Sequence, residues 1–184
     1  MTMTMPSTIR PYRESDRDTL RAMTVEAFQG VSIDQNIDRL LGPLAAKDWT
    51  YRKGKHVDDD IDTPNGEIAV AEDETGRVVG YVSMRYDRAA RVGQIPNAVV
   101  ADGLRGQGLG RKLLEYALDR FRAEGMTVAR IETLDQNPIG QHLYSSVGFR
   151  EVARQIHYAM PLKDNFTAEG AEGTERKTEK NKNQ

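Results

Sequence analysis

Apolar and polar residues alternate with a period of two over residues 67–72 and 77–86, and the turn DETG separates the two segments. Strict alternation is typical of strands that bury one face, so this pair predicts a β-hairpin. Weaker strand patterns occupy four further segments, at residues 8–13, 93–101, 127–133 and 151–160.

Most of the remaining apolar positions recur at helical spacing. Ser15 is a predicted N-cap, and Asn137 followed by Pro138 predicts the start of another helix. The predicted helices run from Ser15 to about Phe28, over 34–41, over 47–61, from a glycine-rich loop to about Gly125, and from Asn137 to Gly148. This order predicts an α/β fold with a hairpin-rich, antiparallel first half and a crossover after the loop.

The strand predicted over residues 93–101 contains Pro96, which has no backbone N–H for a ladder. We expect a bulge there, because an interrupted ladder leaves backbone groups free to meet a ligand. The strand leads into the segment GLRGQGLG at residues 103–110.

Three glycines of that segment, Gly106, Gly108 and Gly110, precede a strongly amphipathic helical pattern. Glycine lets the backbone approach a ligand closely and adopt a positive φ. The first N–H groups of the helix lack intrahelical acceptors and lie at the positive end of its dipole, so a phosphate is a natural ligand. Arg105 and Arg111 bracket the glycines and add candidate charged contacts.

Two familiar phosphate loops fit this segment poorly. A Walker loop requires Ser or Thr after Gly-Lys, whereas Arg111 and Lys112 follow Gly110. A dinucleotide fingerprint requires a third glycine where Arg111 stands, although Glu132 lies roughly where an acidic ribose ligand would be. A nucleotide-binding Rossmann-like module therefore stays a lesser alternative.

Composition excludes several classes. The formal net charge of −2 over 184 residues gives no basic field for nucleic acid. No apolar run reaches the roughly 18 residues of a membrane span, and the start lacks a secretory core, so we expect a cytoplasmic protein without a membrane partner. The chain has no cysteine, and its three histidines lack metal-ligand spacing, so no metal is expected. We expect a flexible N-terminus (1–7), one domain (8–162) and a disordered polar tail (163–184).

Arg105, Gly108 and Gly110 spell R-x-x-G-x-G, which resembles the acetyl-CoA pyrophosphate loop of the GNAT N-acetyltransferase superfamily. The resemblance implies a mixed sheet whose strand before the loop splays from its neighbour. It also implies cofactor contacts for two groups of residues. The main chain of Ala98, Val99 and Val100 is expected to bind the pantetheine arm and the acetyl carbonyl. The pyrophosphate is expected to contact Arg105, Gly106, Gln107, Gly108, Leu109, Gly110 and Arg111. Asp102-Gly103 stands where family members often have a proline.

Glu132, Asn137 and Tyr144 have a spacing similar to that of the GNAT subgroup that acetylates protein N-terminal amines. The resemblance implies that Glu132 is the general base, Asn137 contacts CoA, and Tyr144 binds the cofactor and protonates the departing thiolate. An amine must lose a proton before it attacks, and a phenol can protonate a thiolate, so the residue types suit the chemistry. Each residue also has a structural interpretation: a solvated strand end, a helix cap and a packing aromatic, respectively.

The helices of residues 30–62 and the segment before the last predicted strand are expected to set substrate choice. Asp58, Asp59, Asp60 and Asp62 either collect a cationic substrate or form a solvated helix face. Trp49 and Tyr51 either line a pocket or belong to the core. His142 is interpreted as a helix-surface residue, and His157 either as a strand residue or as one that reaches the substrate groove.

The sequence thus predicts transfer of acetyl from acetyl-CoA to a primary amine by direct attack in a ternary complex. Three kinds of amine stay open: a small molecule, an amino acid, and a peptide or protein N-terminus. A non-catalytic acyl-CoA sensor or scaffold of the same fold is the alternative, and a homodimer stays open.

Overall fold

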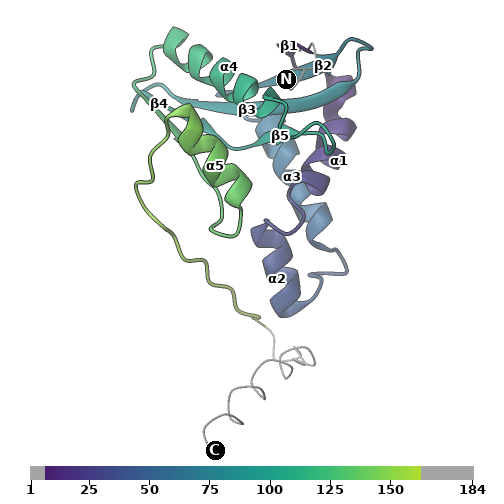
Figure 1. Cartoon of the computed structure of the whole chain (residues 1–184). Coiled ribbons are helices and arrows are strands. Elements are labelled where there is room, and N and C mark those ends of the chain that lie inside the picture. Colours follow the sequence, from purple (N-terminus) through teal and green to yellow (C-terminus); the bar gives the residue numbers. More distant parts are fainter. Residues whose placement is uncertain (1–6, 163–184) are drawn as a thin grey trace, which may run out of the picture.

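The computed structural model describes residues 7–162. The strands in that range are β1 (Ser7–Pro11), β2 (Gly66–Asp73), β3 (Val78–Asp87), β4 (Val92–Ile95), β5 (Ala98–Val100) and β6 (Val128–Ile131). The helices are α1 (Arg17–Ala27), α2 (Ile33–Leu41), α3 (Trp49–Ile61), α4 (Leu109–Ala123) and α5 (Pro138–Val147), with a short 3-10 helix, η1 (Glu14–Asp16), before α1 (Figure 1).

The strands form one mixed sheet in the order β1-β2-β3-β4-β6, with β5 paired to β3. All pairs from β1 to β4 are antiparallel, and β4 pairs with β6 in parallel, with Ile95 opposite Ile131. This arrangement confirms the predicted α/β class, the antiparallel first half and the crossover after the glycine-rich loop.

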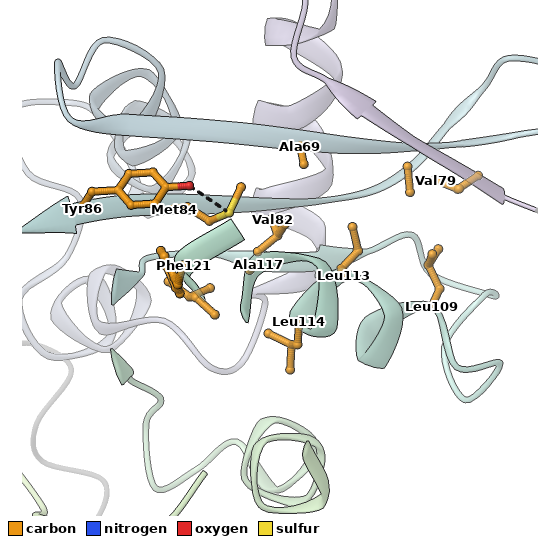
Figure 2. Packing of buried hydrophobic residues seen from close by; sticks show 12 residues of the cluster. Ala69, Val79, Val82, Met84, Tyr86, Leu109, Leu113, Leu114, Ala117 and Phe121 are labelled. Atoms are coloured by element: carbon orange, nitrogen blue, oxygen red, sulfur yellow. Dashed lines mark hydrogen bonds between the residues drawn. The ribbon is translucent and has the colours of Figure 1, made fainter. Parts of the chain in front are cut away.

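Helices cover both faces of the sheet, so the central strands are buried on both faces and not on the one face that strict alternation predicts. Residues 68–71 of β2 are all buried. One face packs against α4, whose buried residues are Leu109, Leu113, Leu114, Ala117 and Phe121 (Figure 2). The other face packs against Leu20 and Met23 of α1 and Val57 of α3. Burying each of these leucines contributes roughly 1.5–3 kcal/mol.

Gly93 of β4 allows α4 to sit close to the sheet. A Cβ at this position would lie 2.5 Å from the ring of Phe121. The same ring meets Tyr86 of β3 edge-on, with 5.3 Å between the ring centroids. The small residue therefore fixes the depth at which α4 packs.

The first helix begins later than predicted. Glu14–Asp16 form η1, with Arg13 in the N-cap position, and α1 starts only at Arg17. Ser15 thus lies inside η1 rather than at a cap position. The carboxylate of Asp16 organises this turn, because it accepts hydrogen bonds from the backbone N–H of Arg13 at 2.8 Å and from Arg10 at 2.7 Å.

The predicted last strand, residues 151–160, is wrong: in the described range this segment pairs with no strand. Figure 1 shows it leaving α5 and running away from the sheet. Its apolar side chains are exposed, with Val152 97% and Tyr158 90% accessible. Alternation in sequence reports only which side chains share a face, whereas a strand also needs a neighbouring edge for its backbone hydrogen bonds.

The two predicted terminal segments lie largely outside the described residues, which exclude 1–6 and 163–184. Ser7, assigned to the flexible N-terminus, is the first residue of β1. Within 7–162, no helix has the length and hydropathy to cross a bilayer.

Candidate functional site

A break between β4 and β5 opens the sheet. The predicted interruption at Pro96 is present: β4 ends at Ile95 and β5 begins at Ala98. Ser83 of β3 holds the intervening Asn97, because the Asn97 N–H donates to Ser83 Oγ at 2.9 Å and the Ser83 N–H donates to the Asn97 carbonyl at 2.9 Å. β6 pairs with β4 only as far as Ile95, so the parallel pairing of these two strands ends at the break.

One edge of β5 faces that gap. Val99 lies opposite Tyr81 in the ladder with β3. On either side of this pair, the Ser83 N–H donates to the Asn97 carbonyl and the Ala101 N–H donates to the Val79 carbonyl, so every second residue from Asn97 to Ala101 bonds to β3. The backbone groups of Ala98 and Val100 therefore point away from β3. In the described chain no strand pairs with that edge. Of the three residues predicted to offer backbone groups, Ala98 and Val100 have them directed into the gap, while Val99 uses its own on β3.

The glycine-rich loop continues directly from β5 into α4. Gly103, Gly106 and Gly108 have φ between +77° and +86°, a region that side chains disfavour. Among residues 7–162, no side chain caps α4. The N–H groups of its first turn, from Leu109 onward, are therefore open to an anion.

Gly110, by contrast, lies where α5 and β5 come close to the start of α4. A Cβ there would lie 3.1 Å from Leu143 of α5 and 3.7 Å from Val100 of β5. This close approach brings the loop, the free edge of β5 and α5 together at one place.

The two arginines of the loop differ in availability. Arg111 donates to the carbonyl and hydroxyl of Ser146, each at 3.0 Å, and so ties α4 to α5. Arg105 makes a longer, 3.7 Å ion pair with the exposed Asp102. Arg105 is thus the freer of the two to turn toward a phosphate.

Glu132 directly follows β6, one residue past the Ile95–Ile131 pair and level with the break. Its side chain is 63% exposed and accepts a 2.7 Å hydrogen bond from Arg130. The exposure of Glu132 agrees with its interpretation as a solvated strand end. Its position level with the break is also compatible with a role as the general base.

Tyr144 lies on α5 next to Leu143, the residue that contacts Gly110. Its ring meets Phe149 edge-on, with 6.4 Å between centroids. Burial raises the pKa of the phenol to about 12, because the ionised form loses solvation. The group therefore keeps its proton at neutral pH.

Asn137 has a complete structural role. Its side-chain oxygen caps α5 by accepting from the Gly140 N–H at 3.1 Å, and its Nδ2 donates to Thr133 at 2.8 Å. A cofactor contact would have to share or replace these bonds.

The loop between β6 and α5 is fastened to the α1–α2 connection. Gln136 Nε2 donates to the Gly30 carbonyl at 2.6 Å, and Asn36 Nδ2 donates to Gln136 Oε1 at 2.9 Å. The start of the region expected to set substrate choice thus lies beside the loop that follows Glu132.

A polar cavity of about 220 Å³ lies beside the break, lined by residues that include Lys53, His56, Asp60, Arg85, Pro96 and Asn97. Asp60, one of the lining residues, is buried. It accepts hydrogen bonds from Ser83 at 2.7 Å, Asn97 at 2.6 Å and Arg85 at 2.5 Å. Lys53 completes the group by donating to Asn97 Oδ1 at 3.3 Å.

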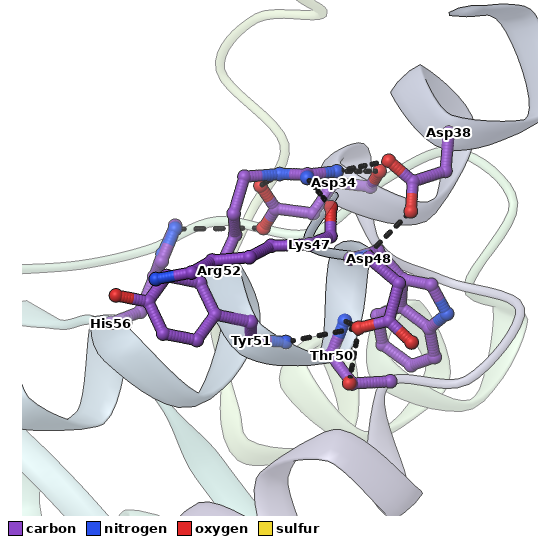
Figure 3. A network of polar contacts seen from close by, with 9 residues as sticks. Asp34, Asp38, Lys47, Asp48, Thr50, Tyr51, Arg52 and His56 are labelled. Carbon is purple, nitrogen blue, oxygen red and sulfur yellow. Dashed lines mark hydrogen bonds and ion pairs between the residues drawn. The ribbon is translucent and has the colours of Figure 1, made fainter. Parts of the chain in front are cut away.

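The other candidates on α3 serve mainly to hold helices together. Figure 3 shows Arg52 of α3 reaching Asp34 and Asp38 of α2, while His56 lies 3.5 Å from Asp34. Tyr51 is exposed and lies beneath Lys47, 3.8 Å from the ring centroid. It therefore belongs to neither the core nor the cavity.

Most of the acidic run is also paired with cations of the chain itself. Asp58 and Asp62 contact Arg17 at 3.0 and 3.3 Å, and Asp59 contacts Lys55 at 3.7 Å. Within the described residues, no group of histidine and acidic side chains is placed to hold a metal ion.

A family model described as the acetyltransferase (GNAT) family matches residues 36–149, more than half of the chain. The chain belongs to the GNAT acetyltransferase family. The resemblance inferred from Arg105, Gly108 and Gly110 is thereby confirmed. The individual roles of Glu132, Asn137 and Tyr144 in this GNAT chain stay predictions.

Two curated relatives match parts of this GNAT chain. The mycothiol acetyltransferase of Beutenbergia cavernae is 30% identical over 120 residues, 65% of this chain and 39% of that protein. The ribosomal protein bS18 alanine N-acetyltransferase of Haemophilus ducreyi is 35% identical over 66 residues, 35% of this chain and 46% of that protein. The matched parts therefore span less than half the length of either relative.

A solved structure agrees with the fold. The aminoglycoside N-acetyltransferase AAC(6')-Iy, in complex with CoA, superposes with a TM-score of 0.62 at 14% identity. The match covers 87% of this chain and 98% of that chain. At this identity the likeness shows the GNAT fold, including the mixed sheet.

Sequence reasoning missed the buried cluster around Asp60. A signal was present, because Lys53, His56 and Asp60 are spaced i, i+3, i+7 and share one face of α3. Lys53 contacts Asn97 and Asp60 contacts Ser83, 44 and 23 residues further along the chain, while His56 lies beside Asp34 of α2. The spacing alone therefore did not reveal what this face would meet.

Proposed function

We propose that this GNAT domain is an acetyl-CoA-dependent N-acetyltransferase that acts on a primary amine by direct attack in a ternary complex. The free edge of β5, followed after the loop of residues 101–108 by the uncapped N-terminus of α4, carries the proposal. An elongated ligand with a diphosphate at one end and a thioester at the other matches these two sets of free backbone groups.

The cofactor contacts follow the course of the chain. The open N–H groups of residues 106–111 suit the diphosphate, with Arg105 as an added cation. The backbone of Ala98 and Val100 suits the pantetheine amides and the thioester carbonyl. Backbone donors aimed at a carbonyl that gains negative charge are worth roughly 3–4 kcal/mol each in known enzymes.

Acetyl-CoA supplies an acetyl group activated as a thioester. The amine nitrogen attacks the carbonyl carbon, the C–S bond breaks, and the sulfur takes the bond's electron pair. Glu132 accepts the proton that the amine loses, directly or through water, and Tyr144 gives its proton to the departing sulfur. Because burial raises the pKa of Tyr144 to about 12, the proton is available at neutral pH.

The acceptor belongs to the classes that the sequence left open: a small amine, an amino acid or a peptide or protein N-terminus. The names of the two relatives, a mycothiol acetyltransferase and a ribosomal-protein alanine N-acetyltransferase, support acylation of an amine but differ in acceptor. A cytoplasmic location, the absence of nucleic-acid and membrane partners and the domain limits 8–162 stay predictions from the sequence, and the oligomeric state stays open.

Calorimetry with CoA, followed by thiol release from acetyl-CoA in the presence of an amine panel, tests the function. We expect binding and amine-dependent release. CoA binding without thiol release in the presence of any amine would favour the sensor or scaffold alternative. In a thermal shift assay, a rise in Tm with NAD but not with CoA would favour a nucleotide-binding module.

A further inference from the structure

Lys53 of α3 is a buried cation that, among the described residues, forms no ion pair with a carboxylate. Its side chain is more than nine-tenths buried, and its Nζ lies 3.6 Å from the ring centroid of Phe28. Apart from this ring, its polar contact is the neutral side chain of Asn97 at 3.3 Å. Burial lowers the pKa of the ammonium group, since the charged form has lost water. Such a position is costly unless an anion completes it.

Arg85 is the second cation that lines the same cavity. Its Nη2 is taken by Asp60, but its Nε is buried and has no hydrogen-bond partner within residues 7–162. The carboxylate of Asp60 accepts hydrogen bonds from Ser83, Asn97 and Arg85, and it makes no direct contact with the Lys53 ammonium group. Asp59, the other carboxylate of the lining, is exposed and lies 3.7 Å from Lys55, so among the described residues neither carboxylate of the cavity contacts the Lys53 ammonium group.

We propose that this cavity binds a carboxylate of the acceptor, and that the acceptor is a free α-amino acid. This inference rests on the proposed N-acetyltransferase function and names its substrate class. At about 220 Å³ the cavity is smaller than the roughly 300–1,000 Å³ of sites for drug-sized ligands, which suits a small acceptor.

The geometry links the carboxylate to the reacting nitrogen. Lys53 contacts Asn97, the residue at the break, and Ala98, with its free backbone groups, comes next in the chain. In an α-amino acid the amine nitrogen is two bonds from the carboxylate carbon, roughly 2.5 Å away. A carboxylate held by Lys53 thus places the amine beside the proposed position of the thioester. Polyamines lack this anion, and a peptide N-terminus has replaced it by an amide.

The first experiment compares acids with matched amides on the wild-type full chain. The common L-amino acids and their α-carboxamides are titrated calorimetrically into the CoA-loaded protein and assayed for thiol release with acetyl-CoA. We expect at least one free amino acid to bind, and to be acetylated with kcat/KM at least about tenfold above its carboxamide. Equal or better use of carboxamides would overturn the inference.

The second experiment removes the ammonium group. Lys53→Met keeps the aliphatic stem, and we expect KM for the amino acid to rise about 10- to 100-fold, with little change in kcat or in the KM of the carboxamide. Lys47→Met, at an exposed position outside the cavity lining, is the control. If Lys53→Met fails to fold, the acid and amide comparison on the wild type still decides.

The two proposals fail in different ways. Thiol release with spermidine or a peptide N-terminus, and none with amino acids, overturns the carboxylate site while the acetyltransferase function stands. Amino-acid binding that discriminates against carboxamides, without thiol release from any amine, supports the site and overturns the catalytic function. Absence of both amino-acid binding and thiol release overturns both.

Discussion

Asp60 and Asn97 are joined by a buried 2.6 Å hydrogen bond that fixes the break between β4 and β5 to helix α3. Asn97 is held from both sides, since Ser83 binds its backbone and Asp60 its side chain. The position of the gap in the sheet thus depends on a polar group at its base. A break maintained in this way keeps its backbone edge free without depending on bound ligand.

Asp60→Asn tests this arrangement. The substitution removes the negative charge that pairs with Arg85 and places an amide group against the amide of Asn97. We expect the free energy of unfolding to fall by about 2–4 kcal/mol. Urea denaturation measures the change, with Asp59→Asn, at an exposed position on the same helix, as the control. A loss below about 1 kcal/mol would show that the cluster does not stabilise the break.

Gly108→Ala tests the anion-binding loop. Gly108 has φ +86°, and no atom of the described chain lies within 4 Å of the position that a Cβ would take, so the expected damage comes from backbone strain rather than from a clash. Such strain costs about 1–2 kcal/mol. Because the strained turn also misplaces the first N–H groups of α4, we expect the Kd for CoA to rise about tenfold by calorimetry.

Gly103→Ala is its matched control. Gly103 has φ +77°, also in open space, but lies before the R-x-x-G-x-G motif. We expect a similar loss of stability with a much smaller change in CoA affinity. Equal effects of the two substitutions on the Kd for CoA would show that CoA affinity depends on the overall conformation of the loop and not specifically on the N–H groups at the start of α4.

The sequence was sufficient to predict features that depend on local chemistry. Pro96 cannot donate to a ladder, and Gly108 at the start of an amphipathic helix tolerates a positive φ, so both the break and the loop were predictable. The pairing of 67–72 with 77–86 followed from alternation. These features are encoded by residues that are near neighbours in the chain.

Features that depend on distant partners were not predictable. The role of Asp60 depends on Ser83 and Asn97, which only the packing of α3 on the sheet brings together. Residues 151–160 alternate like a strand but lack a neighbouring edge in the described structure. Local pattern specifies which face a residue can bury, whereas the partner is decided by the tertiary fold.

Asp16→Asn tests the electrostatics at the start of α1. Hydrogen bonds from Arg10 and from the Arg13 N–H hold the pKa of Asp16 below its ordinary value of 3.8. A depressed folded-state pKa contributes stability above the unfolded-state value, and this contribution is lost as the pH falls through the folded-state value. We expect the substitution to cost about 1–3 kcal/mol at pH 7 and much less near pH 2. Denaturation curves at both pH values check this, with the exposed Asp18→Asn as control, and an equal loss at both would contradict it.

Glu132→Gln tests the proposed base. The substitution keeps the size of the side chain and removes its ability to take a proton, so we expect kcat/KM to fall about 10²- to 10⁴-fold at neutral pH. The acidic limb of the pH–rate profile should disappear, while CoA binding stays unchanged. The exposed Glu151→Gln serves as control. A profile that keeps its acidic limb would assign the proton to another group.

Tyr144→Phe tests the proposed acid. The ring and its edge-on contact with Phe149 are kept, so we expect unchanged stability and CoA affinity, and a fall in kcat of about 10²- to 10⁴-fold. Because burial raises the pKa of Tyr144 to about 12, the wild-type phenol stays protonated through pH 10, and its ionisation lowers the rate only as the pH approaches 12. Tyr158→Phe, at a highly exposed position, controls for loss of a hydroxyl elsewhere. A kcat within twofold of the wild type would mean that the thiolate leaves without a proton from Tyr144, and the proposed mechanism would then need solvent as its acid.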